Sequence, residues 1–352
     1  MPGMHNTSGN VSLLDCTLRD GGWVQDFQFG SEAMQEILYG LEEAGVPRIE
    51  TGYLDKAHGS GKERSMYADF AAFERNGIQN RRRPGTEHIV MIDCGKYPAE
   101  MIPAAENAAG TGISGIRICF HKDGAEKAIH LGRDILDKGY SLYMQPMVTT
   151  RYTEEEFGDL IRAVMKHLPE TAAIYLVDSF GVMDSPEVSE RLLLMDRVLP
   201  PETAAGLHIH NNRGQCRKMA ETACELLGGK RKLYIDGTLG GIGKGAGNLE
   251  TQEFAAYLNQ NWGTGYDTER LVRIAEAVIR PISEEYHWGI LPEYELTARY
   301  RTSPTYANFF FREKQVSLRQ LETLLANLPE EKKDSFDRPF AAAFFEEMAG
   351  DE

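Results

Sequence analysis

The feature that most constrains the fold of this chain is a regular alternation of short apolar segments with amphipathic segments, from Val11 to about Asn261. Apolar runs rich in β-branched residues predict strands, and apolar residues spaced one helical turn apart predict helices between them. Residues 31–44, for example, begin with Ser31 and carry apolar residues on one face, and Gly45 closes this predicted helix. The predicted strands cover residues 11–17, 47–53, 87–93, 114–120, 140–147, 171–177, 205–210 and 231–236.

Strands that alternate with helices in this way predict an α/β protein with a (β/α)8 TIM barrel, and an open doubly wound sheet is the alternative. Polar residues at or near the ends of the predicted strands favour the barrel, because a barrel carries its active site at the carboxyl ends of its strands. We expect residues 1–269 to form the catalytic barrel and residues 270–352 to form a helical C-terminal extension. The polar residues are Arg19, Asp20, Glu50, His121, Asp178, Ser179, His208 and His210.

The predicted extension is rich in Glu and Lys but also in apolar residues, and helices are expected at 315–328 and 340–348. Its phenylalanine and leucine content is too high for a solvated tail, so it is expected to pack on the barrel or on another subunit. A homo-oligomer is therefore expected, and a dehydrogenase or a biosynthetic enzyme is a further candidate partner.

The composition argues against several classes of partner. The chain has a formal net charge of −15, with 42% hydrophobic and 26% charged residues. Nucleic acids and anionic membranes need a basic surface, which this chain is not expected to have. No apolar run approaches the roughly 20 residues that span a bilayer, and the N-terminus lacks a signal-peptide core, so a cytoplasmic protein is expected. The five cysteines are scattered without a CxxC pair, which predicts buried thiols and neither a disulfide framework nor a zinc ribbon.

Two histidines, His208 and His210, alternate on a predicted strand, so both imidazoles point to the same side. Such a pair either binds a divalent metal or lies hydrogen-bonded in the interior. Residues 14–22 favour the metal, because an apolar run there delivers Arg19 and Asp20 to its end. One carboxylate and two imidazoles suit Mn²⁺, Mg²⁺, Fe²⁺ or Zn²⁺. Arg19 would stabilise a developing enolate, and the alternative is a structural ion pair with Asp20.

These motifs resemble the signatures of the DRE-TIM metallolyases, also called the HMG-CoA-lyase-like superfamily, over most of the predicted barrel. Residues 15–21, Asp-Cys-Thr-Leu-Arg-Asp-Gly, resemble the D-x-T-L-R-D-G signature of that family. Residues 208–211, His-Ile-His-Asn, resemble its H-x-H-N motif, and Glu50 is similar to its glutamate on strand two. The resemblance implies a TIM barrel that binds a divalent metal and handles an enolate.

The resemblance also implies roles for individual residues. Asp20, His208 and His210 would bind the metal, for which Mn²⁺ or Mg²⁺ is expected. Arg19 would stabilise the enolate and Glu50 would support the site. Asn248 ends a glycine-rich segment and resembles the asparagine that approaches the metal in the HMG-CoA lyase branch. The alternatives for that segment are a flexible loop and an anion site formed by backbone amides.

Three details resemble the 2-oxo acid aldolases of this superfamily, such as the 4-hydroxy-2-oxovalerate aldolases. The Arg-Asp pair is followed by two glycines, where the Claisen synthases carry Glu-Gln. Residues 117–121 resemble the R-x-x-x-H of these aldolases, which implies a catalytic His121, and residues 304–309 resemble the segment that carries their active-site tyrosine, here Tyr306. The alternatives are a solvated or capping His121 and a Tyr306 that packs against phenylalanines.

One position departs from the aldolase pattern. Trp23 stands where the oxovalerate aldolases carry a histidine that acts as general base. The proton would then pass to a metal-bound hydroxide, His121, Tyr306 or Asp26. Trp23 itself would either enclose an apolar or ring-shaped substrate group or pack in the core.

The sequence thus predicts a divalent-metal-dependent aldolase or lyase that cleaves or forms a C–C bond of a 4-hydroxy-2-oxo acid through a pyruvate-type enolate. Its partners would be a small 2-oxo acid and an aldehyde. Asp178 and Ser179, which resemble the family's D-[ST]-x-G turn, are expected to contact the substrate, unless they only form the turn. The alternatives are a Claisen-type enzyme that condenses an acyl thioester with a 2-oxo acid, and a metal-binding partner subunit with little activity of its own.

Overall fold

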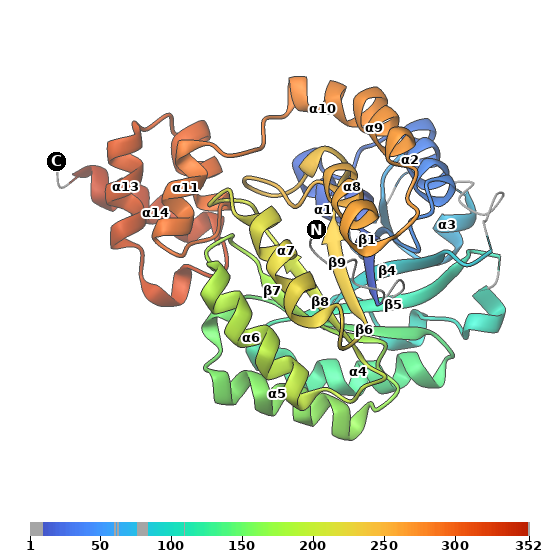
Figure 1. Cartoon of the computed structure of the whole chain (residues 1–352). Helices are drawn as coiled ribbons and strands as arrows, with labels where there is room; N and C mark the ends of the chain where they lie inside the picture. Colours follow the sequence, from blue (N-terminus) through green and yellow to red (C-terminus); the bar gives the residue numbers. More distant parts are fainter. Residues whose placement is uncertain (1–9, 60, 62, 76–83, 109, 351–352) are drawn as a thin grey trace.

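Eight parallel strands close into a barrel in the computed structural model, which describes residues 10–350 except 60, 62, 76–83 and 109 (Figure 1). The ring closes because β1 pairs in parallel with both β9 and β2. The predicted TIM barrel is confirmed, and a two-residue strand, β3, pairs with the end of β2 outside the ring. The strands are β1 Val11–Asp15, β2 Arg48–Leu54, β3 Met66–Tyr67, β4 Glu87–Asp93, β5 Ile113–Phe120, β6 Ser141–Pro146, β7 Ala173–Asp178, β8 Ala204–Ile209 and β9 Leu233–Gly237.

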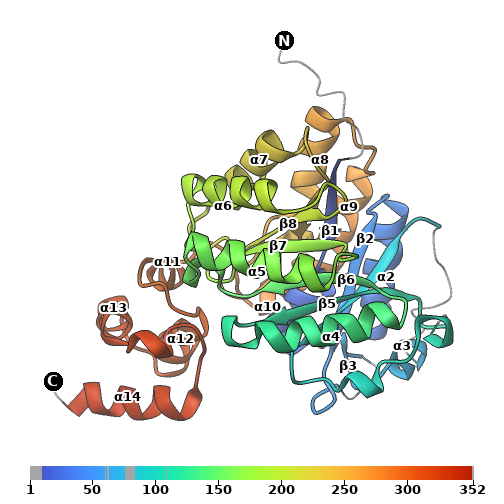
Figure 2. The same cartoon turned by 90° about the horizontal axis from the view of Figure 1, so that it is seen from below.

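Helices cover the outside of the barrel, and a second group of helices lies to one side of it (Figures 1 and 2). The barrel helices are α1 Thr17–Asp20, α2 Ser31–Glu43, α3 Ala71–Arg75, α4 Ala125–Asp137, α5 Glu154–His167, α6 Ser185–Val198, α7 Cys216–Leu227, α8 Thr251–Trp262, α9 Thr268–Ile274 and α10 Arg280–Glu285. The lateral group consists of α11 Pro292–Arg299, α12 Thr305–Ala307, the π-helical segment Asn308–Glu313, α13 Leu318–Asn327 and α14 Arg338–Gly350.

Local sequence signals set several helix starts. Thr153 and Glu156 form a capping box at the start of α5, and Asp184 caps α6 by accepting a bond from the amide of Glu187. The strands between the helices are almost wholly buried, as expected for a parallel sheet covered on its outer face. All five cysteines are free thiols, and four are buried as predicted, whereas Cys94 is partly exposed.

The amino ends of the strands are closed by a polar layer. The guanidinium of Arg48 lies 3.7 Å from the centre of the Tyr234 ring, and Arg48 is also 3.5 Å from a carboxylate oxygen of Glu87. Tyr143 donates a hydrogen bond to the same Glu87. These pairs fill the barrel at the amino ends of its strands. The open end of the barrel is therefore the one at the carboxyl ends of the strands.

The lateral helices have a hydrophobic core of their own, centred on Tyr306, Phe310 and Leu325. The helices expected at 315–328 and 340–348 correspond to α13 and α14. The boundary expected between barrel and extension, after residue 269, falls within α9. Leu271 and Ile274 of this helix pack in the core of the barrel. A separate C-terminal extension from residue 270 stays a prediction. Across the described ranges, no helix combines the length and the apolar composition that crossing a bilayer requires.

Candidate metal centre

The site begins where α1 follows β1 almost directly. Asp15 ends the strand, and its carboxylate accepts hydrogen bonds from the amide of Thr17 (2.9 Å) and the hydroxyl of Thr251 (2.6 Å). These bonds fix the turn between the strand and the single-turn helix that carries Arg19 and Asp20. Both side chains are therefore held, buried, at the carboxyl end of the barrel.

Asp20, His208 and His210 come together, as the sequence predicts. One candidate ligand atom from each lies within 4.8 Å of the other two. Nε2 of His210 is 3.8 Å from Oδ2 of Asp20, and the imidazole rings lie 5.2 Å apart and almost perpendicular. All three residues are buried. The cluster thus offers one carboxylate and two imidazoles.

Asp236 on β9 fixes the orientation of His208. Its Oδ2 lies 3.0 Å from Nδ1 of His208, and its two oxygens accept hydrogen bonds of 2.7 and 3.2 Å from Arg117. Arg117 on β5 also donates to Oε1 of Gln145 at 2.8 Å. Because the carboxylate occupies Nδ1 of His208, Nε2 is left to face a metal, which is the usual arrangement of metal-binding histidines.

The glycine-rich loop lies directly on the Asp20 carboxylate. Asn248 donates through Nδ2 to Oδ2 of Asp20, and to the carbonyl of Ile242 at 3.2 Å. Oδ1 of Asn248 is buried and has no hydrogen-bond partner among the described residues. A Cβ at Gly243 would lie 2.1 Å from Nδ2 of Asn248 and 2.8 Å from Oδ2 of Asp20, so the loop needs glycine at this position.

Glu50 holds Arg19 in place. It accepts a hydrogen bond from Nε of Arg19 at 2.7 Å and lies 3.6 Å from Nη1 of Arg117. Nη1 of Arg19 donates to Asp20 at 2.6 Å. The remaining Nη2 of Arg19 is buried and has no partner in the part of the chain that the structure describes. Arg19 thus combines an ion pair with a free donor beside the ligand cluster.

The electrostatics of the site favour the forms of Asp20 and His210 that bind metals. Burial would raise the pKa of Asp20, but Arg19 and the two imidazoles outweigh it and hold the pKa well below its usual range. Burial lowers the pKa of His210 to about 4, and Asp20 opposes only part of this shift. At neutral pH, Asp20 is therefore an anion and His210 is a neutral imidazole, as metal binding requires.

The donor set and its surroundings fit a divalent cation. The buried carboxylates of Asp20, Glu50 and Asp236 face the two guanidinium groups of Arg19 and Arg117. This excess of negative charge would be offset by a cation. The unpartnered amide oxygen beside Asp20 offers a further oxygen ligand, so the residues present suit a metal that accepts both nitrogen and oxygen donors.

Asp178 and Ser179 are engaged by backbone amides. The carboxylate of Asp178 accepts from the amides of Val182 (3.0 Å) and Met183 (2.8 Å), and the hydroxyl of Ser179 accepts from the amide of Val148 (3.0 Å). Burial raises the pKa of Asp178 to about 6 even though these amides oppose the shift. The contacts agree with the turn-forming interpretation, and a substrate contact stays a prediction.

The contacts described for His121 and Tyr306 do not include Asp20, His208 or His210. His121 is exposed immediately after β5. Tyr306 is fully buried, stacks on Phe310 with 5.9 Å between ring centres, and donates its hydroxyl to the carbonyl of Lys332 at 2.8 Å. These contacts agree with the interpretation of Tyr306 as a packing residue of the lateral helices, and catalytic roles for both residues remain untested.

Two residues beside the cluster were missed by the motif analysis, Asp236 and Lys244. Asp236 interrupts the otherwise apolar and fully buried strand β9, and a charge at such a position was the available signal. Lys244 is a lone cation within a glycine-rich loop, and its carbonyl lies 3.2 Å from Nδ1 of His210. Nδ1 of each of the two cluster histidines is thus occupied.

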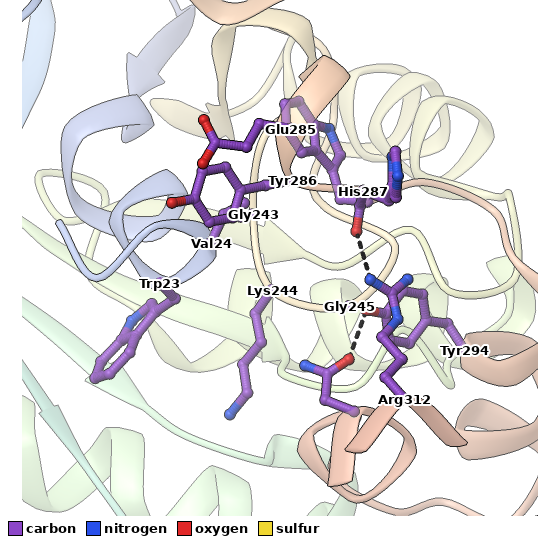
Figure 3. Close-up of a pocket in the computed structure, with 12 residues that line it drawn as sticks. Trp23, Val24, Gly243, Lys244, Gly245, Glu285, Tyr286, His287, Tyr294 and Arg312 are labelled. Carbon is purple, nitrogen blue, oxygen red and sulfur yellow. Dashed lines mark hydrogen bonds between the residues drawn. The ribbon is translucent and has the colours of Figure 1, made fainter. Parts of the chain in front are cut away.

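A pocket of about 210 Å³ opens beside the glycine-rich loop (Figure 3). Trp23 and Lys244 line it from the barrel, and Tyr294 and Arg312 line it from the lateral helices. Trp23 is 51% exposed, and its ring lies edge-on to Phe27 at 5.0 Å. Trp23 is therefore not a core residue but part of the pocket wall.

Comparison with known proteins points to the same class of enzyme. The sequence profile of the HMGL-like family matches residues 108–278. The 4-hydroxy-2-oxovalerate aldolase of Pseudoalteromonas translucida is 30% identical over 286 residues, which cover 78% of this chain and 77% of the relative. The 4-hydroxy-2-oxovalerate aldolase 2 of Rhodococcus jostii is 28% identical over 326 residues, which cover 88% and 86%.

A solved structure shares the fold. The N-terminal domain of a Bacteroides vulgatus protein described as an aldolase superposes with a TM-score of 0.73 at 22% identity, over 88% of this chain and 99% of that domain. Together, the aldolase relatives, the family and the cluster of one carboxylate and two histidines indicate the class of metal-dependent lyases. Within that class, the chain belongs to the HMGL-like family, the DRE-TIM metallolyases, whose aldolases depend on a divalent metal.

Proposed function

We propose that this lyase cleaves, and in reverse forms, the C–C bond of a 4-hydroxy-2-oxo acid, with a pyruvate-type enolate and an aldehyde as the two fragments. The names of the two aldolase relatives support this substrate class. The observation that carries the proposal is the unpartnered Nη2 of Arg19 beside the cluster of Asp20, His208 and His210. A site that only stores a metal needs no such donor.

Asp20, His208 and His210 would hold Mn²⁺ or Mg²⁺, and Oδ1 of Asn248 would be an additional oxygen donor. The bound cation would supply Lewis-acid polarisation of the 2-oxo group. Asp236 would keep His208 in the tautomer whose Nε2 is free.

In the cleavage direction, the C–C bond between carbons 3 and 4 breaks, and its electron pair becomes the enolate of the 2-oxo fragment. The 4-hydroxyl would give its proton to a solvent water as the aldehyde forms, and carbon 3 of the enolate would take a proton back from water to give the 2-oxo acid. Nη2 of Arg19 would donate a hydrogen bond to the developing enolate oxygen. Burial opposes the charge of Arg19, but Glu50 and Asp20 outweigh burial and raise its pKa. Arg19 therefore stays charged and stabilises the enolate without giving up its own proton.

The proposal is tested by incubating the Mn²⁺-loaded protein with 4-hydroxy-2-oxopentanoate and following pyruvate through coupled reduction to lactate. We expect pyruvate release that depends on added metal. His208→Ala should abolish it, whereas Lys218→Met, on the exposed face of α7, should retain it. Turnover of acyl thioesters without cleavage or formation of any 4-hydroxy-2-oxo acid would instead identify a Claisen-type enzyme.

Assembly is a separate proposal. Residues 1–269 would be the catalytic unit, and the segment from residue 270 would serve a homo-oligomer or the docking of a dehydrogenase or another biosynthetic enzyme in the cytoplasm. The apolar side chains of Ile290 and Leu318, which are 62% and 39% exposed, support an assembly role. Light scattering of the purified protein would give the oligomeric state directly.

A further inference from the structure

The pocket at the glycine-rich loop adjoins the metal-ligand cluster. Gly243 forms part of its wall, and a Cβ added at Gly243 would lie 2.8 Å from Oδ2 of Asp20, so a single residue separates the two spaces. The far wall comes from the lateral helices, through Tyr294 and Arg312. A substrate held at the cluster could therefore extend into this pocket, toward the lateral helices.

The loop backbone that carries Lys244 is firmly held. The carbonyl of Lys244 lies 3.2 Å from Nδ1 of His210 and accepts from the amide of Gly247 at 3.2 Å. The amide of Ala246 donates to Oδ1 of Asn212 at 3.1 Å. The side chain of Lys244 is thus projected into the pocket from a fixed base (Figure 3).

The Lys244 ammonium is a cation of this pocket that interacts electrostatically with the nearby Asp20 carboxylate. Within the described residues it forms no ion pair or side-chain hydrogen bond. Arg312, by contrast, is paired with Glu293 at 3.1 Å. Glu285 also lines the pocket but lies across it from the Lys244 ammonium in Figure 3.

The pocket also offers apolar surface. The half-exposed ring of Trp23 stands edge-on to Phe27 and to Tyr53, which fix its position at the barrel mouth. An aromatic ring beside a lysine can cover a short carbon skeleton while the ammonium pairs with a terminal charge.

We propose that this pocket recognises an oxyanion, a carboxylate or a phosphate, at the far end of the aldehyde fragment, with Lys244 as its ion-pair partner and Trp23 against its carbon chain. The inference rests on the proposed function, because it concerns the aldehyde half of the same aldol reaction. It makes Lys244 a specificity-determining residue for the substrate class.

The test compares matched aldehydes in condensation with pyruvate: succinic semialdehyde against butanal, and glyceraldehyde 3-phosphate against glyceraldehyde. We expect kcat/KM to favour one charged aldehyde over its neutral counterpart by about 10- to 100-fold, the range of one charge-assisted hydrogen bond. The pair with the larger ratio identifies the oxyanion as carboxylate or phosphate.

Variants at position 244 assign the preference to the ammonium. Lys244→Met should remove the preference, because kcat/KM falls more for the charged than for the neutral aldehydes, and Lys218→Met on α7 should change neither. Lys244→Arg should keep most of the preference. Because arginine forms no imine with aldehydes, a preference retained in this variant would show that it depends on the positive charge. Equal kcat/KM values within both pairs, or an equal loss for charged and neutral aldehydes in Lys244→Met, would overturn the inference.

Deuterium exchange into pyruvate needs no aldehyde. It therefore tests the enolate chemistry separately from the role of Lys244 in recognising the aldehyde. Exchange by the wild type together with no turnover of charged aldehydes would overturn the role of Lys244 and leave the enolate chemistry standing. Absence of exchange would overturn the proposed function, and this inference with it.

Discussion

At the scale of single residues, the charged groups of the site hold one another in position. Glu50 orients Arg19, and Asp236 orients both His208 and Arg117. Buried charges are costly unless they are paired, so each pairing also restricts where a side chain can lie. The proposed metal ligands are thus held in place by the protein itself, which is the condition for tight and selective binding.

Replacing Asp236 should weaken metal binding even though Asp236 is not a ligand. In Asp236→Asn, the amide is a poorer partner for Nδ1 of His208, and we expect Mn²⁺ affinity to fall about 10- to 100-fold. Calorimetric titration with Mn²⁺ measures the change. Asp196→Asn is the matched control, because it removes the carboxylate that pairs with the buried Arg231 at 2.7 Å, away from the site. Equal affinities for the two variants would contradict the positioning role.

The buried Asp178 predicts a defined pH dependence of stability. Its pKa is raised to about 6 in the folded protein, so between pH 4 and 6 the folded state binds a proton that the unfolded state has lost. The contribution of Asp178 to stability therefore falls as pH rises through this window, by roughly 3 kcal/mol in total.

Asp178→Asn removes this titration. Relative to the variant, the wild type should be more stable at pH 4 than at pH 8, as measured by urea denaturation at both values. Asp15, whose pKa burial also raises to about 6, is present in both proteins and cancels in the difference. If the difference in unfolding free energy between wild type and variant does not change with pH, the pKa of Asp178 is not raised in the folded protein.

At the scale of elements, the glycine-rich loop after β9 connects the ligand cluster to the pocket. Gly243→Ala should displace Asn248 and Asp20, because its Cβ would lie 2.1 and 2.8 Å from their side-chain atoms. We expect Mn²⁺ affinity to drop about tenfold or more with the fold retained. Gly229→Ala is the control, since nothing lies within 4 Å of its added Cβ. Unchanged affinity in a folded Gly243→Ala protein would mean that the loop does not support the ligands.

The strands and the ligand set could be predicted from the sequence because both are local patterns. Strand β4 matches the expected range 87–93, and the alternation of His208 and His210 needs only two residues of backbone geometry. The roles of Asp236 and Arg117 could not be predicted, because their pairing joins β9 to β5 across the barrel, 119 positions apart in the chain. Periodicity carries no information on such contacts.

At the scale of the whole molecule, the lateral helices pack beside the open end of the barrel. Arg151, after β6, pairs with Asp334 at 2.9 Å and with Glu330, and Asn212 after β8 donates to Thr297 at 3.4 Å. The sequence predicted these helices, but it left open whether they pack on the barrel or on another subunit. Only the tertiary contacts show that they wall one side of the pocket.

Tyr306→Phe tests whether the lateral helices contribute to the chemistry. The change removes a hydrogen bond to the carbonyl of Lys332 and should lower stability by about 1 kcal/mol in urea denaturation. Because Tyr306 is buried within the lateral core, we expect enolate formation to continue at the wild-type rate. A folded variant that loses enolate formation would assign Tyr306 to the catalytic machinery.

The most direct test of the enolate chemistry is deuterium incorporation into the methyl group of pyruvate, measured by mass spectrometry in D₂O with Mg²⁺ or Mn²⁺. We expect exchange by the metal-loaded wild type, and a loss of at least about 100-fold in Arg19→Ala and in His208→Ala, each shown to be folded by its thermal transition. Lys218→Met should exchange like the wild type. Exchange no faster than with the metal ion alone, or exchange that survives the loss of Arg19, would contradict an enolate-forming site at this cluster.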